Sequence, residues 1–358
     1  MRNQTTKIST LVFDWGDTLM VNDPEQSGPM VTWPRVAALE GASQALAGLS
    51  GRYQCVLATN ASDSRSREVR QALARVGLDG YLKAVFTSGE LGFRKPDPRF
   101  FRGLQSVLGL DPDQLVMIGD DYRADILGAQ LAGWNSLWFN PSGTTAPGLL
   151  PSHDAEVSRL EDLTAQLETP FMPGYAQCLA WLQEQQLPQN LLAHVHAVAS
   201  AAYLLAVWLR AAGQPVDPLL AHRGGLLHDL AKLKAKERSP EQRIGHAELA
   251  ALMLEDRGEP LLAECARRHA LFAILQPELA PRTWEEKLVY FADKLVEGSR
   301  VAGLDERILS LRQRYPSDSE KIAAMAPALY TLQDELCLAL GFPAAELVRR
   351  IKTAFYSA

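Results

Sequence analysis

The chain has 358 residues, 47% of them hydrophobic, and its formal net charge is -6. This length favours two domains at roughly 100–200 residues each, and the composition is that of a globular rather than a disordered protein. The negative charge argues against a protein that coats nucleic acid, because binding to phosphate backbones normally needs an excess of Lys and Arg.

Short apolar runs alternate with helical patterns in the first half of the chain. The runs that predict strands are 8–14, 53–59, 83–87, 115–120 and 135–139. The patterns that predict helices are 64–76, 98–108 and 124–132, and a glycine follows each of them. Strands that alternate with helices predict a parallel sheet in a doubly wound α/β fold. Ligands of such folds bind beyond the carboxyl ends of the strands, where Asp14, Thr59 and Asp120 are found.

The second half has a different pattern, in which helical periodicity dominates. A stretch rich in Pro, Gly, Ser and Thr (140–152) and a short strand and helix (155–166) end the first half of the chain. We therefore expect a multidomain protein, with a first domain over 1–168, a Pro-containing linker over 169–174 and a second domain over 175–358. Helices are predicted over 191–211, 219–232, 246–257, 261–269 and 284–299, with others beyond. This pattern predicts an all-α second domain.

Four motifs at the strand ends of the first half carry compatible chemistry. They are Asp14-Trp15-Gly16-Asp17, Thr59-Asn60, Lys95-Pro96 and Gly119-Asp120-Asp121, and Asp125 follows the last. A carboxylate can attack phosphorus and form an aspartyl-phosphate, which divides one difficult step into two. Further carboxylates can hold Mg²⁺, and a hydroxyl and an ammonium can stabilise the charge of the phosphoryl group. Taken alone, each residue has a plainer explanation, since Asp125 suits a helix cap and Lys95 the surface.

In this order, the motifs resemble the haloacid dehalogenase (HAD) superfamily of phosphatases over about residues 8–165. The resemblance implies a Rossmannoid sheet with Asp14 as the catalytic nucleophile. It implies that Thr59 and Lys95 are catalytic as well and bind the phosphoryl group together with Asn60. It also implies a Mg²⁺ site formed by Asp14, Gly16 through its backbone carbonyl, Asp120 and Asp125, the last of which supports the others.

The sequence departs from this family at the position of the usual general acid. The family usually carries a second aspartate two residues after the nucleophile, where this chain has Gly16, and Asp17 lies one residue further on. Protonation of a leaving group contributes roughly 10²–10⁴-fold. The departure implies slow turnover, a restriction to good leaving groups, or an acid supplied by Asp17 or the substrate.

The two gaps that hold cap domains in the family, 20–54 and 61–94, are short in this chain. We therefore expect a capless member. An open site of this kind suits a bulky substrate, unless the helical domain or another subunit covers it.

Histidine and aspartate recur on the predicted helices of the second half. The residues are His194, His228, Asp229, His246, His269 and Asp293. Apolar neighbours direct such side chains into the core of a helical bundle, where they can form a metal site. Mixed imidazole and carboxylate ligands suit transition metals such as Fe, Mn, Co, Ni or Zn rather than Ca²⁺. Two such metals can activate a shared water and bind a phosphate.

This second set resembles the HD superfamily of phosphohydrolases, and within it the bacterial symmetrical diadenosine tetraphosphate hydrolases. The resemblance implies that Asp229 is catalytic and bridges two metals, Fe or Mn being favoured. One ion is then completed by His194, His228 and Asp293. Dinuclear members add His246 and His269, whereas a mononuclear site needs neither. Candidate phosphate contacts are Lys232 and Arg300, and His153, His196 and His222 fit no position of the motif.

The sequence favours a bifunctional, metal-dependent phosphohydrolase. The HD half is expected to cleave a nucleotide phosphoanhydride or phosphodiester, and the HAD half a phosphate monoester. One alternative is the processing of nucleic-acid ends, against which the net charge of -6 counts. Another is an HD hydrolase whose HAD half only binds a phosphorylated ligand. The substrate of either half and the oligomeric state, including a homo-oligomer, stay open.

Cysteine usage and hydropathy bear on the compartment. The four cysteines are scattered without zinc-ribbon spacing, which indicates reduced residues in a cytoplasmic protein. The polar start of the chain predicts no signal peptide. The longest apolar stretch, 195–208, is too short and too polar to cross a bilayer, so no membrane partner is expected. The expected partner is a phosphorylated small molecule, with a nucleotide favoured.

Overall fold

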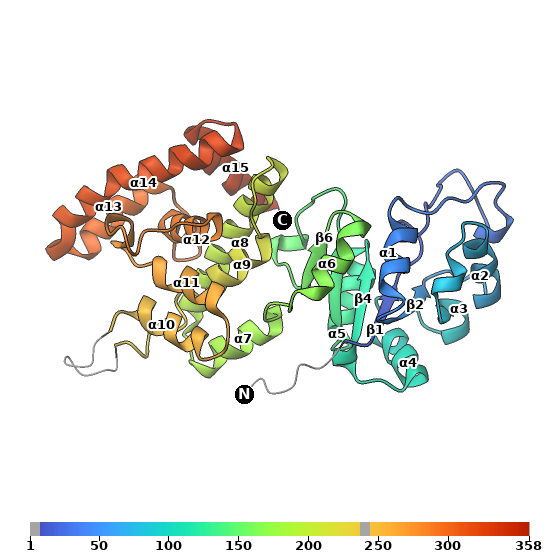
Figure 1. Ribbon diagram of the computed structural model, residues 1–358. Coiled ribbons are helices and arrows are strands. Elements are labelled where there is room, and N and C mark those ends of the chain that lie inside the picture. Colours follow the sequence, from blue (N-terminus) through green and yellow to red (C-terminus); the bar gives the residue numbers. More distant parts are fainter. Residues whose placement is uncertain (1–7, 237–243, 358) are drawn as a thin grey trace. The chain divides into compact units, whose positions relative to one another are not determined.

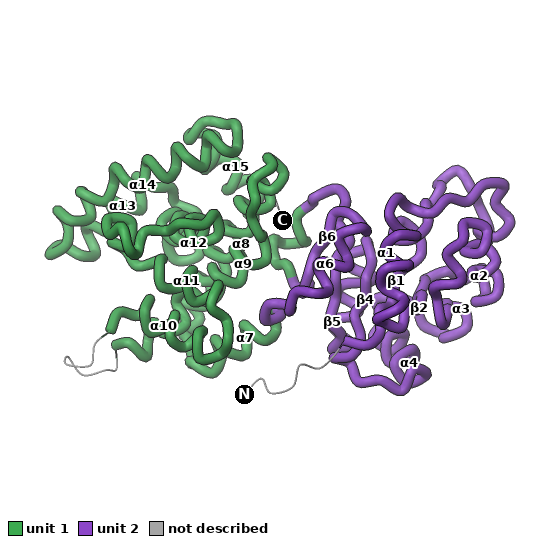
Figure 2. Tube along the Cα trace, in the orientation of Figure 1, with its two compact units in different colours: residues 1, 145–151, 175–358 green, residues 2–144, 152–174 purple. Residues whose placement is uncertain are grey.

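A computed structural model describes residues 8–236 and 244–357. The chain divides into two compact units (Figure 2). The α/β unit comprises 2–144 and 152–174, and the helical unit comprises 145–151 and 175–358. Residues 145–151 belong to the helical unit, although the sequence pattern placed them in the first domain. Side chains of that unit hold its backbone, since Tyr203 accepts a hydrogen bond from the amide of Ala146 at 2.9 Å and Ser200 donates one to the carbonyl of Leu149 at 3.3 Å.

The described part of the α/β unit contains a sheet with the strand order β3-β2-β1-β4-β5-β6, in which all neighbours are parallel (Figure 1). The strands are β1 (Thr10–Phe13), β2 (Gln54–Thr59), β3 (Ala84–Thr87), β4 (Leu115–Gly119), β5 (Asn135–Phe139) and β6 (Ala155–Val157). Phe13 lies opposite both Leu57 and Ile118 in the ladders. The residues after β1, β2 and β4 therefore meet at one edge of the sheet, and the prediction of a doubly wound α/β fold is confirmed.

Each face of this sheet has its own apolar core, because successive side chains of a strand point to opposite faces. Leu11 and Phe13 of β1 belong to one core, which includes residues of α1 (Ala42–Leu49), α2 (Ser66–Ala74) and α6 (Leu163–Glu168). Val12, between them, belongs to the other core, with residues of α4 (Pro98–Leu108) and α5 (Gly128–Leu131). The very short α3 (Ser88–Leu91) follows β3.

The segment 124–132, which was expected to form one α-helix, is only partly α-helical. Residues Tyr122–Leu127 form a π-helical turn before α5 begins at Gly128. Asp121 caps the turn by accepting hydrogen bonds from the amides of Arg123 and Ala124 at 2.9 and 2.8 Å. Wider turns of this kind occur frequently at functional sites, and this one carries Asp125.

The described part of the second half is helical, which confirms the predicted fold class. Its helices are α7 (Tyr175–Glu184), α8 (Gln189–Ala211), α9 (Pro218–Leu227), α10 (His246–Glu255), α11 (Pro260–Arg268), α12 (Trp284–Leu295), α13 (Leu304–Arg314), α14 (Ser319–Leu340) and α15 (Ala344–Ser357). A small antiparallel hairpin, β7 (Val296–Glu297) with β8 (Arg300–Val301), ends the helix expected over 284–299 at Leu295. Helix α8 is long and apolar enough to cross a membrane, but 67% of its most apolar window is buried.

Two adjacent glycines let α9 approach its neighbours closely. A Cβ atom on Gly225 would lie 2.7 Å from Cα of Ala199 in α8, and one on Gly224 would lie 2.9 Å from Cβ of Cys265 in α11. The contact at Gly225 is with backbone, which cannot turn aside as a flexible side chain can. This packing places the end of α9, and the residues that follow it, between α8 and α11.

Replacement of Gly225 by alanine is therefore expected to destabilise the helical unit by about 1–3 kcal/mol through overpacking. The variant should also lose bound metal, because His228 and Asp229 follow directly. Urea unfolding followed by circular dichroism measures the first effect, and metal analysis the second. Unchanged stability would contradict the close approach of α8 and α9.

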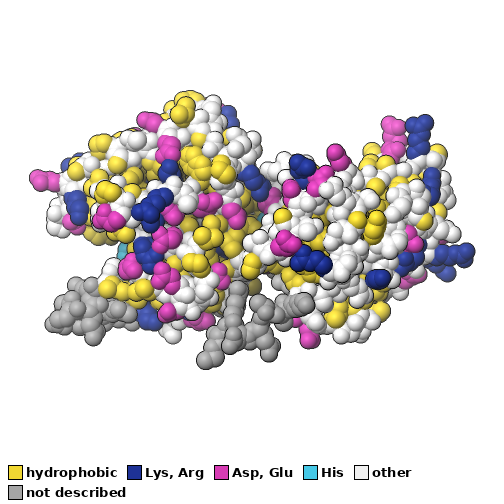
Figure 3. Space-filling model, viewed as in Figure 1, with side chains coloured by type: hydrophobic (Ala, Val, Ile, Leu, Met, Phe, Trp, Pro, Cys, Tyr) yellow, Lys and Arg dark blue, Asp and Glu magenta, His cyan; other side chains and the backbone are white. Residues whose placement is uncertain are grey.

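On the face drawn in Figure 3, basic and acidic side chains are interspersed with apolar ones. Among the described residues visible there, no broad field of one sign covers either unit. The described residues of this face give no basic track for a nucleic-acid backbone.

Candidate active sites

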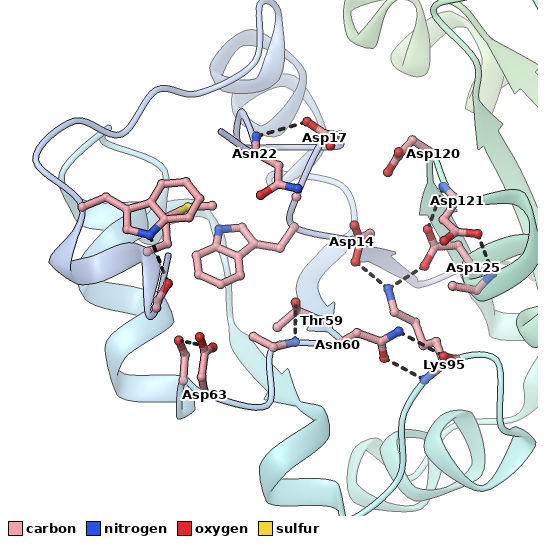
Figure 4. Close-up of a pocket in the computed structure, with 18 residues that line it drawn as sticks. Asp14, Asp17, Asn22, Thr59, Asn60, Asp63, Lys95, Asp120, Asp121 and Asp125 are labelled. Carbon is pink, nitrogen blue, oxygen red and sulfur yellow. Dashed lines mark hydrogen bonds and ion pairs between the residues drawn. The ribbon is translucent and has the colours of Figure 1, made fainter. Parts of the chain in front are cut away.

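A cavity of about 400 Å³ lies at the carboxyl end of the sheet in the α/β unit (Figure 4). It brings together the predicted residues Asp14, Gly16, Thr59, Asn60, Lys95, Asp120 and Asp125. Carboxylate oxygens of Asp14, Asp120 and Asp125 lie within 4.8 Å of one another. The cavity therefore collects groups from three strand ends that are far apart in sequence.

Lys95 is the central cation of this cavity. Its Nζ donates hydrogen bonds to Asp14 Oδ1 and Asp125 Oδ1, both at 2.5 Å (Figure 4). Its residue is only 3% exposed. Burial on its own lowers the pKa of Lys95, but the charges of Asp125 and Asp14 outweigh it and raise that pKa. Lys95 therefore stays charged, as a group that binds phosphoryl oxygens must.

Asn60 acts on Lys95 through the backbone. Its Nδ2 donates to the carbonyl of Lys95 at 3.0 Å, and its Oδ1 accepts from the amide of Lys95 at 2.8 Å. These two hydrogen bonds hold the Lys95 backbone in place. Asn60 also lines the cavity, and its predicted contact with phosphate stays a prediction.

Asp125 has partners on both carboxylate oxygens. Oδ1 accepts from Lys95, and Oδ2 accepts from the amide of Asp121 at 3.2 Å. A Cβ atom on Gly119 would overlap the Asp125 carboxylate, so only glycine leaves it room. Burial raises the pKa of Asp125, opposed by the Lys95 ammonium. These contacts suit Asp125 to holding Lys95, and leave Asp14 and Asp120 as the carboxylates accessible to an ion.

The donors of this cavity fit Mg²⁺, which prefers carboxylate and carbonyl oxygens. Asp120 is oriented by Thr18, whose hydroxyl donates to Asp120 Oδ1 at 2.9 Å and accepts from the Asp120 amide at 3.2 Å. Burial raises the pKa of Asp120 to about 6, and the nearby charge of Asp14 contributes. A carboxyl group with this pKa is half protonated in mildly acidic solution.

Mg²⁺ binding to the α/β unit is therefore expected to depend on pH in one direction. Above the pKa of about 6, Asp120 is ionised and affinity should be constant; below it, each Mg²⁺ competes with a proton. Affinity should then fall by up to about tenfold per pH unit. Titration calorimetry of the full chain across this range measures the effect. A constant affinity below the Asp120 pKa would show that Asp120 does not bind the ion.

Asp17 also lines this cavity, and its role as the missing acid stays a prediction. Its backbone φ is 57°, and its Oδ1 accepts a hydrogen bond from the amide of Asn22 at 3.1 Å. Figure 4 shows this carboxylate next to Asn22, whereas Asp14 lies beside Lys95. Gly16 itself has room for a side chain, because the nearest atom to a Cβ there is Asn22 Cβ at 3.7 Å.

An apolar wall of this cavity was not predicted from the sequence. Trp15, Met30 and Trp33 line it, and all three are buried. The indole Nε1 of Trp15 is buried and has no hydrogen-bond partner among the described residues. Trp15 adjoins the nucleophile in sequence, which was an available signal. Met30 and Trp33 come from a single 3-10 turn, Met30–Thr32, and its C-cap, which are too short to show periodicity.

The helical unit forms a second cavity of about 480 Å³. The predicted metal ligands come from five places in the chain: His194 from α8, His228-Asp229 after α9, His246 from α10, His269 after α11 and Asp293 from α12. All of them except His228 line the cavity, and His228 is buried beside it. His194, His228 and Asp293 form one group with ligand atoms within 4.8 Å, and His228, Asp229 and His269 form another.

Backbone carbonyls fix the orientation of three of these histidines. Nδ1 donates to the carbonyl of Gly298 at 2.9 Å in His194, of Gly225 at 2.7 Å in His228 and of Ala266 at 2.5 Å in His269. Because a carbonyl only accepts, each Nδ1 carries the proton, and the Nε2 lone pair of a neutral ring is free to bind a metal.

The Nε2 atoms gather around Asp229 and Asp293. His246 and His269 place Nε2 at 3.3 and 3.5 Å from Asp229 Oδ1, and at 3.2 Å from each other. His194 Nε2 lies 3.0 Å from Asp293 Oδ1. At these distances a proton or a metal cation must lie between a ring nitrogen and a carboxylate. Burial lowers the pKa of His194, but the Asp293 carboxylate outweighs it and raises that pKa, so a proton can take this place at the His194–Asp293 pair.

Burial provides an independent indication of a metal. His228 Nε2 is buried without a hydrogen-bond partner among the described residues, and burial lowers the pKa of His228 to about 3. Burial would raise the pKa of Asp229, but His228, His246 and His269 outweigh it, so this pKa lies well below the ordinary value. Neutral imidazole beside an ionised carboxylate is the donor set of a divalent transition metal.

The basic residues of this cavity differ in part from those predicted. Lys232 lines it and pairs with Asp229 at 2.9 Å. Arg300 is not among its lining residues, and its side chain pairs with Glu306 and with Glu297 outside it. Lys294, Arg307 and Arg314 do line the cavity and were missed. They lie on or after α12, in a part of the chain where helical periodicity gives no sign of the turn made by β7 and β8.

Comparison with known proteins agrees with this division. The family model described as haloacid dehalogenase-like hydrolase matches residues 16–133, and the HD domain model matches residues 191–298. Phosphoserine phosphatase of Thermus thermophilus is 41% identical over 71 residues, which are 20% of this chain and 28% of that protein. The putative HAD-hydrolase YfnB of Bacillus subtilis is 29% identical over 128 residues, 35% of this chain and 52% of that protein.

A further relative is covered more fully. The uncharacterized protein MJ0778 of Methanocaldococcus jannaschii is 33% identical over 137 residues, which are 35% of this chain and 78% of that protein. By contrast, the chain spans about half or less of phosphoserine phosphatase and YfnB. A solved structure of an uncharacterized protein from Listeria monocytogenes serotype 4b is 23% identical, with a TM-score of 0.40, and covers 45% of this chain and 98% of that one. The chain belongs to the haloacid dehalogenase-like hydrolases through its α/β unit, and its helical unit carries an HD domain.

Proposed function

We propose that this chain is a bifunctional, metal-dependent phosphohydrolase with one active site in each unit. In the α/β unit the substrate is a phosphate monoester. In the helical unit it is a phosphoanhydride or phosphodiester, with a nucleotide favoured. The finer likeness to diadenosine tetraphosphate hydrolases stays a prediction.

The contact between Lys95 and Asp14 carries the proposal for the α/β unit. Lys95 and the Thr59 hydroxyl bind the phosphoryl oxygens, and an Asp14 carboxylate oxygen forms a bond to phosphorus as the bond to the leaving oxygen breaks. Water then cleaves the aspartyl-phosphate, which returns Asp14 and releases phosphate. Mg²⁺ bound by Asp14, Asp120 and the Gly16 carbonyl would neutralise charge on the phosphoryl group. The leaving oxygen receives no proton from position 16, which limits the reaction to good leaving groups.

The buried Nε2 of His228 carries the proposal for the helical unit, because it has no hydrogen-bond partner among the described residues and lies 3.5 Å from Asp229 and 3.7 Å from Asp293. His194, His228, Asp229, His246, His269 and Asp293 would hold two divalent transition metals, with Fe or Mn favoured. Such ions polarise a phosphoryl oxygen and lower the pKa of water. Lys232 holds Asp229 in place and presents its positive charge to the cavity.

The Asp14→Asn variant tests the first site. Hydrolysis of p-nitrophenyl phosphate should fall by roughly 10³-fold or more, because the amide is not a nucleophile. Hydrolysis of dinucleoside polyphosphates by the helical unit should be unchanged. Asp121→Asn is the matched control, since its side chain caps the π-helical turn and an asparagine can still cap it. Full activity of Asp14→Asn would refute the proposed nucleophile.

The same assay distinguishes a binding module from an enzyme. Ligand binding without release of phosphate, or a stable aspartyl-phosphate, would mean that the α/β unit only senses a phosphorylated ligand. Prompt multiple turnover that depends on Asp14 would exclude this alternative.

A further inference from the structure

Arg307 is a buried cation in the cavity of the helical unit, and its side chain has no ion-pair partner among the described residues. It lies in α13, beyond the residues 191–298 that match the HD domain. Its residue is 8% exposed, and its Nε and Nη1 atoms are buried with no hydrogen-bond acceptor among the described residues. It lines the cavity together with the histidines and aspartates of the metal site.

An unpaired buried guanidinium is costly, because it has lost its contacts with water and gained none with protein. The two buried carboxylates of the same cavity have other partners, and Asp318, which also lines the cavity, is exposed and forms no ion pair with Arg307. Asp229 contacts Lys232, His246 and His269, and Asp293 contacts His194 and Lys294. The adjacent residue Glu306 pairs with Arg300. No described carboxylate lies within ion-pair distance of Arg307, so the fold itself does not compensate this charge.

Other cations face the same space. Lys232, Lys294 and Arg314 also line the cavity. Lys294 donates to Asp293 Oδ2 at 2.5 Å and to the carbonyl of His269 at 2.9 Å, so its ammonium is satisfied within the protein. Arg314 pairs with Glu297 at 3.6 Å. Among the described basic side chains of this cavity, Arg307 is therefore the one whose buried N–H groups still need acceptors, which a ligand could supply.

We propose that Arg307 binds a phosphoryl group of the substrate beside the metal site, and that the substrate is polyphosphorylated. The metal ligands take the phosphoryl group that reacts, and Arg307 takes a neighbouring one through charge-assisted hydrogen bonds. This inference rests on the proposed function of the helical unit for the identity of the reacting group. The binding role of Arg307 rests only on its burial, its unpaired atoms and its place in the cavity.

Methylenediphosphonate, a diphosphate analogue that is not hydrolysed, tests the inference by titration calorimetry with the full chain as purified. Arg307→Gln should bind it roughly 10- to 100-fold more weakly than the original chain. The affinity of Arg307→Lys should lie between that of Arg307→Gln and that of the original chain. Arg300→Gln is the matched control, because that arginine lies in the same unit but outside the cavity; its affinity should be unchanged. Equal affinity in Arg307→Gln, or an equal loss in Arg300→Gln, would overturn the proposal.

Thermal unfolding without ligand separates this role from a structural one. Removal of an unpaired buried charge should leave the Tm of Arg307→Gln unchanged or raise it, whereas loss of a structural contact lowers it. A clear fall in Tm for both Arg307→Gln and Arg307→Lys would overturn the proposal. If binding depends on Arg307 but no phosphohydrolase activity depends on Asp229, the anion site stands and the proposed function of the helical unit fails.

Discussion

Asp229→Ala is expected to lower phosphohydrolase activity of the helical unit by roughly 10³-fold or more. Asp229 lies at the centre of the site, where His246 and His269 approach Oδ1 and Lys232 approaches both oxygens. Without this carboxylate, His246 and His269 lose the negative charge that would hold metal cations next to their Nε2 atoms. Hydrolysis of dinucleoside polyphosphates and of nucleotides, assayed with the full chain, measures the loss, and hydrolysis of p-nitrophenyl phosphate by the α/β unit should persist.

His196 supplies a control on the same helix as His194. It lies on α8 two residues from His194, but it does not line the cavity. His194→Ala should lose activity and bound metal, whereas His196→Ala should keep both. Equal effects of the two substitutions, or full activity of Asp229→Ala, would show that the metal site is misplaced.

Gly16→Asp is expected to raise turnover of phosphate monoesters with poor leaving groups by roughly 10²–10⁴-fold. The substitution restores a carboxyl group where HAD phosphatases usually have one. Position 16 can accept a side chain, because a Cβ atom there meets Asn22 Cβ only at 3.7 Å and φ is not in the left-handed region. Turnover of alkyl phosphates should gain most and that of p-nitrophenyl phosphate least, because p-nitrophenolate is a stable anion that leaves without protonation.

Gly16→Ala provides the control for this gain. It adds the same Cβ atom without a carboxyl group, so turnover should stay near that of the original chain. A gain in Gly16→Ala as large as in Gly16→Asp would assign the effect to the backbone. No gain in Gly16→Asp would mean that leaving-group protonation is not what limits this site.

The residues of the first site could be predicted from the sequence because the parallel sheet brings the ends of its strands together. Parallel strands with buried faces appear in sequence as short apolar runs, and the polar residues that follow them meet at one edge. Asp14, Thr59 and Asp120 are found there as expected. The ligand set of the helical unit was predicted for a similar reason, since histidine and aspartate beside apolar residues recur on several helices that pack together.

The remaining contacts depend on geometry that residue types do not encode. The use of Asn60 to hold the Lys95 backbone depends on where two loops meet. Arg300 and Arg307 are alike in sequence, yet the β7–β8 hairpin and α13 place one in exposed ion pairs and the other in the cavity. Periodicity assigns a residue to a helix face, but it does not give the direction of a helix that follows an irregular turn.

Metal analysis of the purified full chain tests the central claim most directly. A dinuclear site predicts close to two transition-metal equivalents per chain that survive dialysis, in addition to exchangeable Mg²⁺. His246→Ala or His269→Ala should reduce the content to about one equivalent, because both histidines place Nε2 near the same oxygen, Asp229 Oδ1. A chain that retains no transition metal, or whose metal content is unchanged in both variants, would contradict the account.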